Sequence, residues 1–240
     1  MRELVDQAMD RIVAHIDSLP AQPAADVAGA AQLARALVEP MPESGVPFSR
    51  ILDHLFDELV PKSFNTAGPG YLAYIPGGGI LHSAVADLIA DSVNRYVGVW
   101  LAAPGLAQLE ANVISWFCQI IGYPPEARGT LSTGGSLANF TAIVTARRNR
   151  LPRNFLGGTL YASDQVHHSV IKAAILAGFP EENVREVASD EEFRIRPDAL
   201  KEAIRTDREA GRSPFLIVAS AGTTNTGAVD DLDGLAQIAQ

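Results

Sequence analysis

The sequence predicts an α/β domain with a largely parallel sheet, preceded by a helical segment. Three observations carry this prediction. Apolar residues recur at helical spacing through the first sixty residues, a stretch rich in Gly and Pro follows over 61–79, and from residue 129 short β-type runs alternate with helical patterns. Such alternation is typical of parallel sheets, because parallel neighbours need a crossover connection that a helix usually supplies.

The first part of the chain is expected to be helical. An amphipathic helix is predicted over 2–19, where apolar residues repeat every three or four positions until Pro20 and Pro23 end the pattern. Further helices are predicted over 27–38 and 48–60. Each has one apolar face, which must be covered either by the rest of the subunit or by a partner subunit. The pattern fits both arrangements.

The α/β region is expected to follow two more helices. The predicted order is a helix over 80–93, a helix over 104–121, a β run at 129–131, a helix over 136–149, a strand at 159–162, a helix over 166–177, a strand at 184–187, a helix over 197–210 and a strand at 214–219. A last helix is expected from Asp230 onward. A parallel unit would continue with another strand, so the sequence reads as cut within a unit.

Composition and charge narrow the functional classes. The 240 residues are 47% hydrophobic and 20% charged, as is usual for globular proteins. A formal net charge of −9 argues against nucleic acid as a partner, because an acidic surface repels phosphate backbones. No signal peptide or apolar stretch of about 20 residues is present, so we expect no membrane span and a cytoplasmic protein. Cys118, the single cysteine, is expected to be buried.

The segment from Leu131 to Asn139 is a candidate phosphate site. A turn of small residues leads directly into a predicted helix, and Gly134 and Gly135 leave the backbone open to a ligand. Free amides at a helix start, with the positive end of the dipole behind them, favour an anion. Ser136 could bind that anion or cap the helix, and a plain Gly-Gly turn with a serine cap explains the same residues. Nucleotide-binding glycine motifs are absent from the sequence.

Two further polar loops follow predicted strands. In the first, Asp164 can cap a helix, and His167 and His168 stand at the start of that helix. Adjacent histidines point in different directions, so we predict no metal site; His167 is either structural or stacks on an aromatic ligand. The second loop, 222–227, contains Thr224. Because ligands bind at the carboxyl ends of strands in open α/β sheets, the three loops together predict one pocket.

In this order the loops resemble the group II pyridoxal-phosphate-dependent decarboxylases, which act on aromatic amino acids, glutamate and histidine. The stretch 132–139 is similar to the family's phosphate-binding motif, 164–167 to its Asp-Gln-x-His motif and 222–227 to its Gly-Thr-Thr loop; 100–110 matches a further stretch. The resemblance runs from about residue 65 to the end. It implies the aspartate-aminotransferase-like PLP-dependent transferase fold (fold type I), truncated and with an N-terminal helical segment.

The resemblance also implies roles for individual residues. Gly135 and Ser136 would bind the phosphate of pyridoxal 5′-phosphate (PLP). His167 would stack on the cofactor ring and act in catalysis, and Thr224 would contact the cofactor. Gly77 would lie beside the carboxylate of the amino-acid substrate.

The same resemblance implies how the chain is organised. Residues 1–90 would form a helical segment that embraces the second subunit of a homodimer, and 91–240 would form the first, incomplete part of the large PLP-binding domain. The implied reaction is decarboxylation of an L-amino acid to its amine and CO2, with PLP as the electron sink.

The resemblance matches no residue of this chain to the lysine that would bind the cofactor or to the aspartate that would keep the cofactor's ring nitrogen protonated. The lysines of the chain are Lys62, Lys172 and Lys201, and none follows a predicted strand end beside the three loops. We therefore assign none of them to the cofactor. We expect a missing C-terminal half or a second polypeptide to supply both residues, and the 240 residues alone to be inactive.

Alternative functions stay open at this point. The same scaffold could catalyse C–C cleavage, transamination or aldehyde formation, or the chain could be a non-catalytic PLP- or phosphate-binding protein. An interaction module built on the N-terminal helices would leave the three loops unexplained. Ile75 and Val99 stand where members that accept aromatic substrates often carry phenylalanine, which argues against an aromatic substrate.

Overall fold

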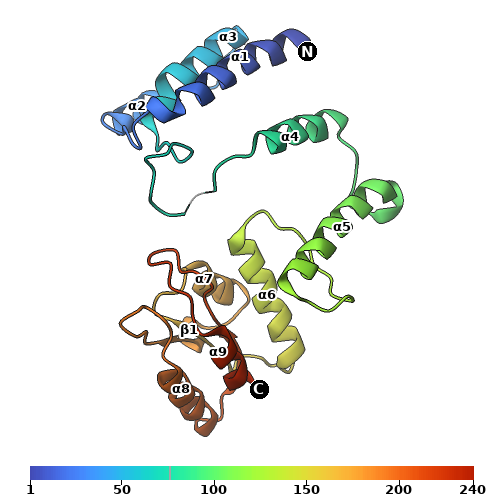
Figure 1. Cartoon of the computed structure of the whole chain (residues 1–240), viewed down its shortest axis with the longest axis vertical. Helices are drawn as coiled ribbons and strands as arrows, with labels where there is room; N and C mark the ends of the chain where they lie inside the picture. The colour runs from blue at the N-terminus through green and yellow to red at the C-terminus, as the bar shows by residue number, and fades with distance from the viewer. Residues whose placement is uncertain (76) are drawn as a thin grey trace. The chain divides into compact units, whose positions relative to one another are not determined.

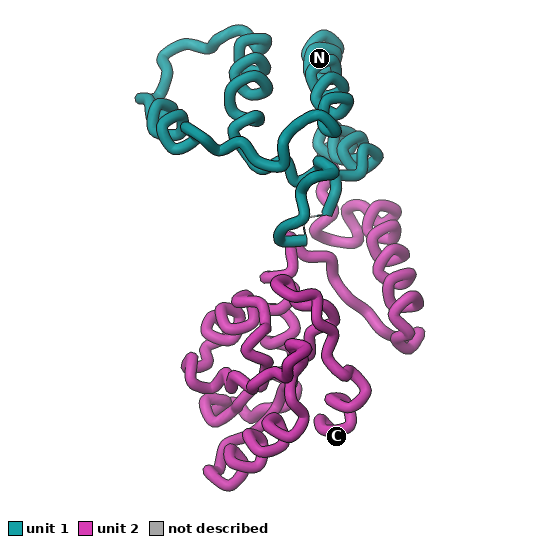
Figure 2. Tube along the Cα trace, turned by 60° about the vertical axis from the view of Figure 1, so that its left-hand side comes forward, with its two compact units in different colours: residues 1–94 teal, residues 95–240 magenta. Residues whose placement is uncertain are grey.

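The computed structural model describes residues 1–75 and 77–240 and divides into two compact units, Met1–Asn94 and Arg95–Gln240 (Figure 2). The named elements of the first unit are helical, and the second unit contains the sheet (Figure 1). In the part of the chain that the structure describes, no helix combines the length and the apolar character needed to cross a bilayer.

The helices predicted for the first unit are present with shorter bounds. Helix α1 spans Arg2–Ser18, and Pro20 lies in the 3-10 turn Leu19–Ala21 that follows it. The remaining helical elements are α2 (Ala30–Ala36), α3 (Phe48–Asp53), a π-helical stretch (His54–Leu59), a 3-10 turn (Val60–Lys62) and α4 (Leu81–Val93). The predicted loop before α4 has irregular backbone; Pro76 lies outside the described residues.

Charged contacts tie α1 and the start of the loop to the rest of the first unit. Arg11 forms an ion pair with Asp57, and its guanidinium lies 5.5 Å from the centre of the Phe56 ring. The Nζ atom of Lys62 donates a 2.8 Å hydrogen bond to Asp26, and this contact holds the pKa of the Asp26 carboxyl below its ordinary value. Lys62 is therefore engaged within its own unit.

The second unit begins with the 3-10 turn Trp100–Ala102 and the long helix α5 (Pro104–Ile121), as the sequence predicts. Gly122 ends this helix with a φ of 85°, a left-handed conformation that suits glycine. The predicted burial of Cys118 is wrong, because the side chain is partly exposed and its neighbours Trp116 and Phe117 are more than half exposed. Few described elements pack against α5.

The parallel sheet is confirmed. Its strands are β1 (Gly158–Ser163), β2 (Val184–Val187) and β3 (Ser213–Val218), and they lie in the order β2-β1-β3 with all pairs parallel. The β run predicted at 129–131 forms no strand, because no described segment pairs with it. The helices between and after the strands are α6 (Gly135–Arg150), α7 (Ser169–Leu176), α8 (Pro197–Glu209) and α9 (Leu232–Ala239).

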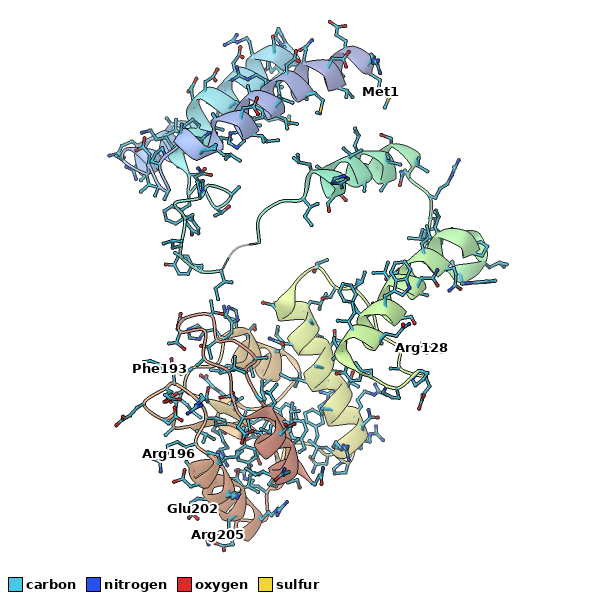
Figure 3. All side chains as sticks on the ribbon, in the orientation of Figure 1. Met1, Arg128, Phe193, Arg196, Glu202 and Arg205 are labelled. Carbon is cyan, nitrogen blue, oxygen red and sulfur yellow. The ribbon has the colours of Figure 1, made fainter. Side chains whose placement is uncertain are left out.

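The helices cover both faces of the sheet. Residues alternate along β1, so Leu160 and Ala162 meet the core formed with α6 and α7, whereas Tyr161 meets the core formed with α8 and α9. All three of these residues are almost fully buried. The outer side of α8 is charged, and Figure 3 shows Glu202 and Arg205 there, joined by an ion pair. The sheet is thus the central layer of an α/β/α arrangement.

A buried polar network fixes α8 to the sheet. The Tyr161 hydroxyl donates a 2.6 Å hydrogen bond to Asp207, and Arg185 on β2 donates to both carboxylate oxygens of Asp207 at 2.6 and 2.9 Å. Burial acts to raise the pKa of Asp207, but the hydrogen bonds from Arg185 and Tyr161 outweigh it, so this pKa lies below its ordinary value. Burial and the bond to Asp207 raise the pKa of Tyr161.

Candidate functional site

The loops after β1 and β3 leave the sheet at one edge. The strands are parallel, and Ala162 near the end of β1 is paired with Val218 at the end of β3. Ser163 is likewise paired with Val187, the last residue of β2. The segments 164–168 and 219–230 therefore start side by side at what we call the carboxyl edge of the sheet. In open α/β folds this edge is the usual ligand-binding edge.

The start of α6 is tied to the same edge. The Nδ2 atom of Asn139 donates a 2.8 Å hydrogen bond to the Oγ atom of Ser169, the first residue of α7. Ser136 lies three residues before Asn139, which is about 4.5 Å along a helix axis. The structure thus brings the predicted phosphate segment together with the loop that carries His167.

The first turn of α6 has the donors that an anion needs. Gly134 precedes the helix with a φ of 155°, a backbone conformation that residues with a Cβ atom rarely adopt. The amides of Leu137 and Ala138 both donate to the Gly134 carbonyl at 3.1 Å, whereas those of Gly135 and Ser136 donate to no acceptor among the described residues. A Cβ built on Gly134 or Gly135 would meet no atom within 4 Å, so the space beside these amides is open.

Ser136 does not cap α6. The N-cap position belongs to Gly134, and no side chain caps the helix. Ser136 is instead the second residue of the helix and is exposed, so its hydroxyl is available beside the free amides. This outcome removes the simple capping explanation of the segment and leaves its phosphate interpretation in place.

His167 lies two residues before the start of α7 and contacts its first residue, Ser169. Its Nδ1 atom accepts a 3.1 Å hydrogen bond from the Ser169 backbone N–H and lies 2.8 Å from the Ser169 hydroxyl. The ring is otherwise exposed. Asp164 does not cap α7 as predicted; its carboxylate accepts from the backbone N–H of Ser189 at 3.3 Å and so braces the turn after β2.

The segment 220–230 after β3, which we call the threonine loop, gives its two central threonines different environments. Thr223 is buried, and its hydroxyl accepts from the backbone N–H of Ala228 at 3.2 Å and pairs with the Thr226 hydroxyl at 2.6 Å. Thr224 is exposed beside it. Thr223 therefore shapes the loop, and Thr224 is left free to meet a ligand.

Asp230 closes this loop, a role that sequence reasoning missed. Its buried carboxylate accepts from the backbone N–H groups of Ser220 at 2.7 Å and Ile195 at 2.8 Å. In the sequence Asp230 and Asp231 both resemble helix-start residues, and Asp231 is the one that caps α9. The available signal was the position of Asp230 one residue before the capping Asp231, since two adjacent aspartates need not share one role.

Other predicted residues lie elsewhere in the chain. Gly77 is exposed in an irregular segment of the first unit, after Tyr74 and Ile75, whose φ angles of 60° and 50° are unusual for such residues. Lys172 is exposed on α7 and Lys201 is exposed on α8. Neither follows a strand end at the carboxyl edge.

A large hollow in the second unit is separate from these loops. It has a volume of about 1060 Å³ and lies between α5, the segment 127–131, α6 and β3. None of the predicted site residues lines it. The cofactor assignment therefore depends on the donors at the carboxyl edge. Those donors, with a flat imidazole beside them, fit a phosphate attached to an aromatic ring.

Comparison with known proteins points to one family. Residues 31–240 match the family described as the pyridoxal-dependent decarboxylase conserved domain. An aromatic-L-amino-acid decarboxylase of Bacillus atrophaeus is 36% identical over 99% of this chain and 50% of its own length. Tryptophan decarboxylase 2 of Oryza sativa subsp. japonica is 32% identical over 85% of this chain and 44% of its own length. The chain spans about half the length of these curated relatives.

Solved structures give the same result for the fold. The structure of Oryza sativa TDC with PLP and tryptamine matches 99% of this chain and 54% of its own with a TM-score of 0.88 and 27% identity. The structure of Catharanthus roseus tryptophan decarboxylase with L-tryptophan matches with a TM-score of 0.89 and 25% identity, over the same two shares. These likenesses confirm the PLP-dependent transferase fold expected from the sequence, over part of its length.

Proposed function

The chain belongs to the pyridoxal-dependent decarboxylase family, and on this premise we propose that it takes part in the PLP-dependent decarboxylation of an L-amino acid to its amine and CO2. The observation that carries the proposal is the meeting of two helix starts at the carboxyl edge. Two hydrogen bonds, from Asn139 to Ser169 and between Ser169 and His167, link the helix that carries the free amides to the exposed ring before α7.

The start of α6 would hold the phosphate. The amides of Gly135 and Ser136 and the Ser136 hydroxyl supply three neutral donors, and the helix dipole adds a positive potential behind them. Neutral donors suffice for one phosphate, so the acidic character of the whole chain does not oppose binding. The open space beside both glycines permits a close approach to the backbone.

His167 and Thr224 would contact the rest of the cofactor. His167 presents a flat, exposed ring whose orientation is fixed through Ser169, as stacking on an aromatic ring requires. The exposed Thr224 sits on a loop that Thr223 and Asp230 hold in shape. Bound there, PLP would supply an electron sink for the charge left on Cα when the carboxylate departs as CO2.

We further propose that the lysine holding the cofactor and its aspartate partner come from outside these 240 residues, either from a C-terminal region or from a second polypeptide. Support comes from the three lysines present. Lys62 is paired with Asp26, and Lys172 and Lys201 lie on exposed helix surfaces. On this view the 240 residues alone are inactive.

The substrate is proposed to be an L-amino acid whose carboxylate lies near Gly77. Relatives of this chain are named for aromatic-L-amino acids, tryptophan, tyrosine and L-DOPA, which makes aromatic L-amino acids the first candidates. Ile75 and Val99 offer less stacking surface than phenylalanine would, so the aromatic preference is a point for experiment.

The assembly is proposed to be a cytoplasmic homodimer. Helices of the segment 1–90 leave large apolar side chains exposed, among them Met9, Ile51 and Leu88. A second copy of the chain would cover such faces. Residues 91–240 then form the first part of the PLP-binding domain.

A second candidate reaction is aldehyde formation. Phenylacetaldehyde synthases of Petunia hybrida and Arabidopsis thaliana are 30% and 28% identical to this chain over 87% and 86% of its length. Product analysis separates the two reactions. Both reactions release one CO2 per substrate. An amine without O2 consumption supports decarboxylation, whereas an aldehyde and ammonia, formed with O2 as the oxidant, support the alternative.

The test is an assay of the complete protein, with the lysine-bearing region present. Carboxyl-labelled L-tryptophan, L-tyrosine, L-DOPA and L-glutamate are supplied in turn, with and without added PLP, and labelled CO2 is counted. Release that depends on PLP and yields the matching amine is expected for at least one substrate. Absence of PLP binding by the complete protein would contradict the proposal.

A further inference from the structure

Ser169 connects two residues of the site through its hydroxyl. It is the first residue of α7 and is 5% exposed. Its Oγ atom lies 2.8 Å from Nδ1 of His167 and 2.8 Å from Nδ2 of Asn139 on α6. Its backbone N–H also points at Nδ1 of His167, with an N–N distance of 3.1 Å. Two donor groups of one residue thus converge on one ring nitrogen.

The backbone contact fixes the proton on the imidazole ring. A backbone N–H can only donate, so the Nδ1 atom of His167 must offer a lone pair to it. A proton on Nδ1 would face the Ser169 N–H directly, leaving two donors opposed. In the neutral ring the proton is therefore on Nε2.

The hydroxyl contact acts in the same direction. An amide Nδ2 group can only donate, so the Ser169 Oγ atom accepts from Asn139. The hydroxyl proton of Ser169 is then free to be donated to Nδ1 of His167. Asn139, Ser169 and His167 form a chain in which every hydrogen bond is directed toward Nδ1, and such chains strengthen their members.

We propose that Ser169 and Asn139 are positioning residues that hold His167 in the Nε2–H tautomer with its ring orientation fixed. The purpose of this arrangement rests on the proposed function, in which His167 meets the cofactor. Nδ1 is engaged by α7, so the accessible edge of the ring presents Nε2–H, a hydrogen-bond donor and not an acceptor. A ligand atom that accepts a hydrogen bond is the matching partner for this edge.

The arrangement also links the two halves of the site. Asn139 belongs to the helix whose start carries Gly135 and Ser136, so the same hydrogen bonds set the position of the ring relative to the phosphate donors. Partners of this kind, which orient a functional histidine from behind, are known to decide its tautomer.

The tautomer can be measured directly in the cofactor-free protein. Ring-¹⁵N-labelled histidine is incorporated, and two-bond ¹⁵N–¹H correlation spectra are recorded well above the ordinary pKa of histidine. Loss of one ring signal in His167→Phe assigns His167. We expect a protonated Nε2 and an unprotonated Nδ1. A protonated Nδ1 in the parent protein would overturn the proposal without recourse to any other variant.

Variants test whether the hydroxyl chain sets the preference. Ser169→Ala keeps the backbone N–H but removes the hydroxyl, so the ratio of Nε2–H to Nδ1–H should fall about fivefold, as expected for one lost hydrogen bond. Asn139→Ala should shift the ratio in the same direction, and Ser169→Thr should restore it. Thr145→Ala is the matched control, because this α6 hydroxyl bonds only to the Thr141 carbonyl in the described structure. An unchanged ratio in Ser169→Ala would contradict the role of the hydroxyl.

These outcomes are independent of cofactor binding. PLP binding by the complete protein, with the lysine-bearing region present, is measured separately by its absorbance. If PLP fails to bind but the parent shows the Nε2–H tautomer, the proposed function fails and the positioning inference stands. If PLP binds but Nδ1 carries the proton, the inference fails and the proposed function stands.

Discussion

Asp230 and Ser220 hold the two ends of the threonine loop together. The Asp230 carboxylate accepts the Ser220 backbone N–H at 2.7 Å, and the Asp230 backbone N–H donates to the Ser220 carbonyl at 2.9 Å. The same carboxylate reaches the N–H of Ile195 at 2.8 Å. One buried side chain thus sets the geometry of the loop that carries Thr224.

Replacement of Asp230 should therefore destabilise the protein. Asp230→Ala leaves the buried backbone N–H of Ile195 and the partly buried backbone N–H of Ser220 without an acceptor, which predicts a loss of about 2–4 kcal/mol in the free energy of unfolding. Asp231→Ala, which removes the exposed cap of α9, should cost only about 1 kcal/mol. Urea unfolding of both variants measures the difference. Equal losses would mean that Asp230 is an ordinary cap.

Asp207 predicts a specific dependence of stability on acid. Its pKa is lowered in the folded protein, so its contribution to stability is complete above its ordinary pKa of about 4 and is lost as the pH falls through the lower folded value. Asp207→Asn should lower the free energy of unfolding at neutral pH and flatten its decline in acid. Unfolding curves across this pH range measure the effect, with the exposed Asp233→Asn as control. A parent curve with the same acid slope as Asp207→Asn would exclude this residue as a cause.

Ser136→Asp should weaken PLP binding far more than folding. The new carboxylate would stand beside the bound phosphate, and repulsion between like charges predicts at least about a tenfold loss of affinity. The helix tolerates the change, because acidic residues suit its first turn. The control is Thr145→Asp, about 13 Å further along the same helix. PLP titration of the complete protein measures the affinity, and the melting temperature measures the effect on folding. Equal PLP affinity in mutant and parent would show that this segment does not bind the phosphate.

His167 and its neighbour should respond differently to substitution. In the complete protein His167→Phe keeps a flat ring, so PLP should bind almost normally while turnover slows. His167→Ala loses the stacking surface, and its PLP affinity should fall by roughly the ~1–2 kcal/mol of an aromatic pair. His168→Ala should change turnover little. A silent His167 together with a damaging His168 would show that the wrong histidine was chosen.

Local patterns in the sequence were sufficient for most of the secondary structure, because its signals are local. The alternation predicted from residue 129 onward included the three strands and their helices, and the glycines before Ser136 predicted an open helix start. The β run at 129–131 and the burial of Cys118 were predicted wrongly, since both depend on neighbours that are distant in sequence. The same limit explains why the bonds from Asn139 to Ser169 and from Ile195 to Asp230 were not foreseen, because they join residues 30 and 35 positions apart in the sequence.

The lysine that holds the cofactor is proposed to lie outside these 240 residues, and one experiment tests this directly. The 240-residue chain is incubated with PLP and reduced with borohydride, and pyridoxyllysine is mapped by mass spectrometry. Because Lys62 is paired with Asp26, and Lys172 and Lys201 lie away from the carboxyl edge, only sparse surface labelling is predicted. Stoichiometric labelling of any one of these three lysines would contradict the account.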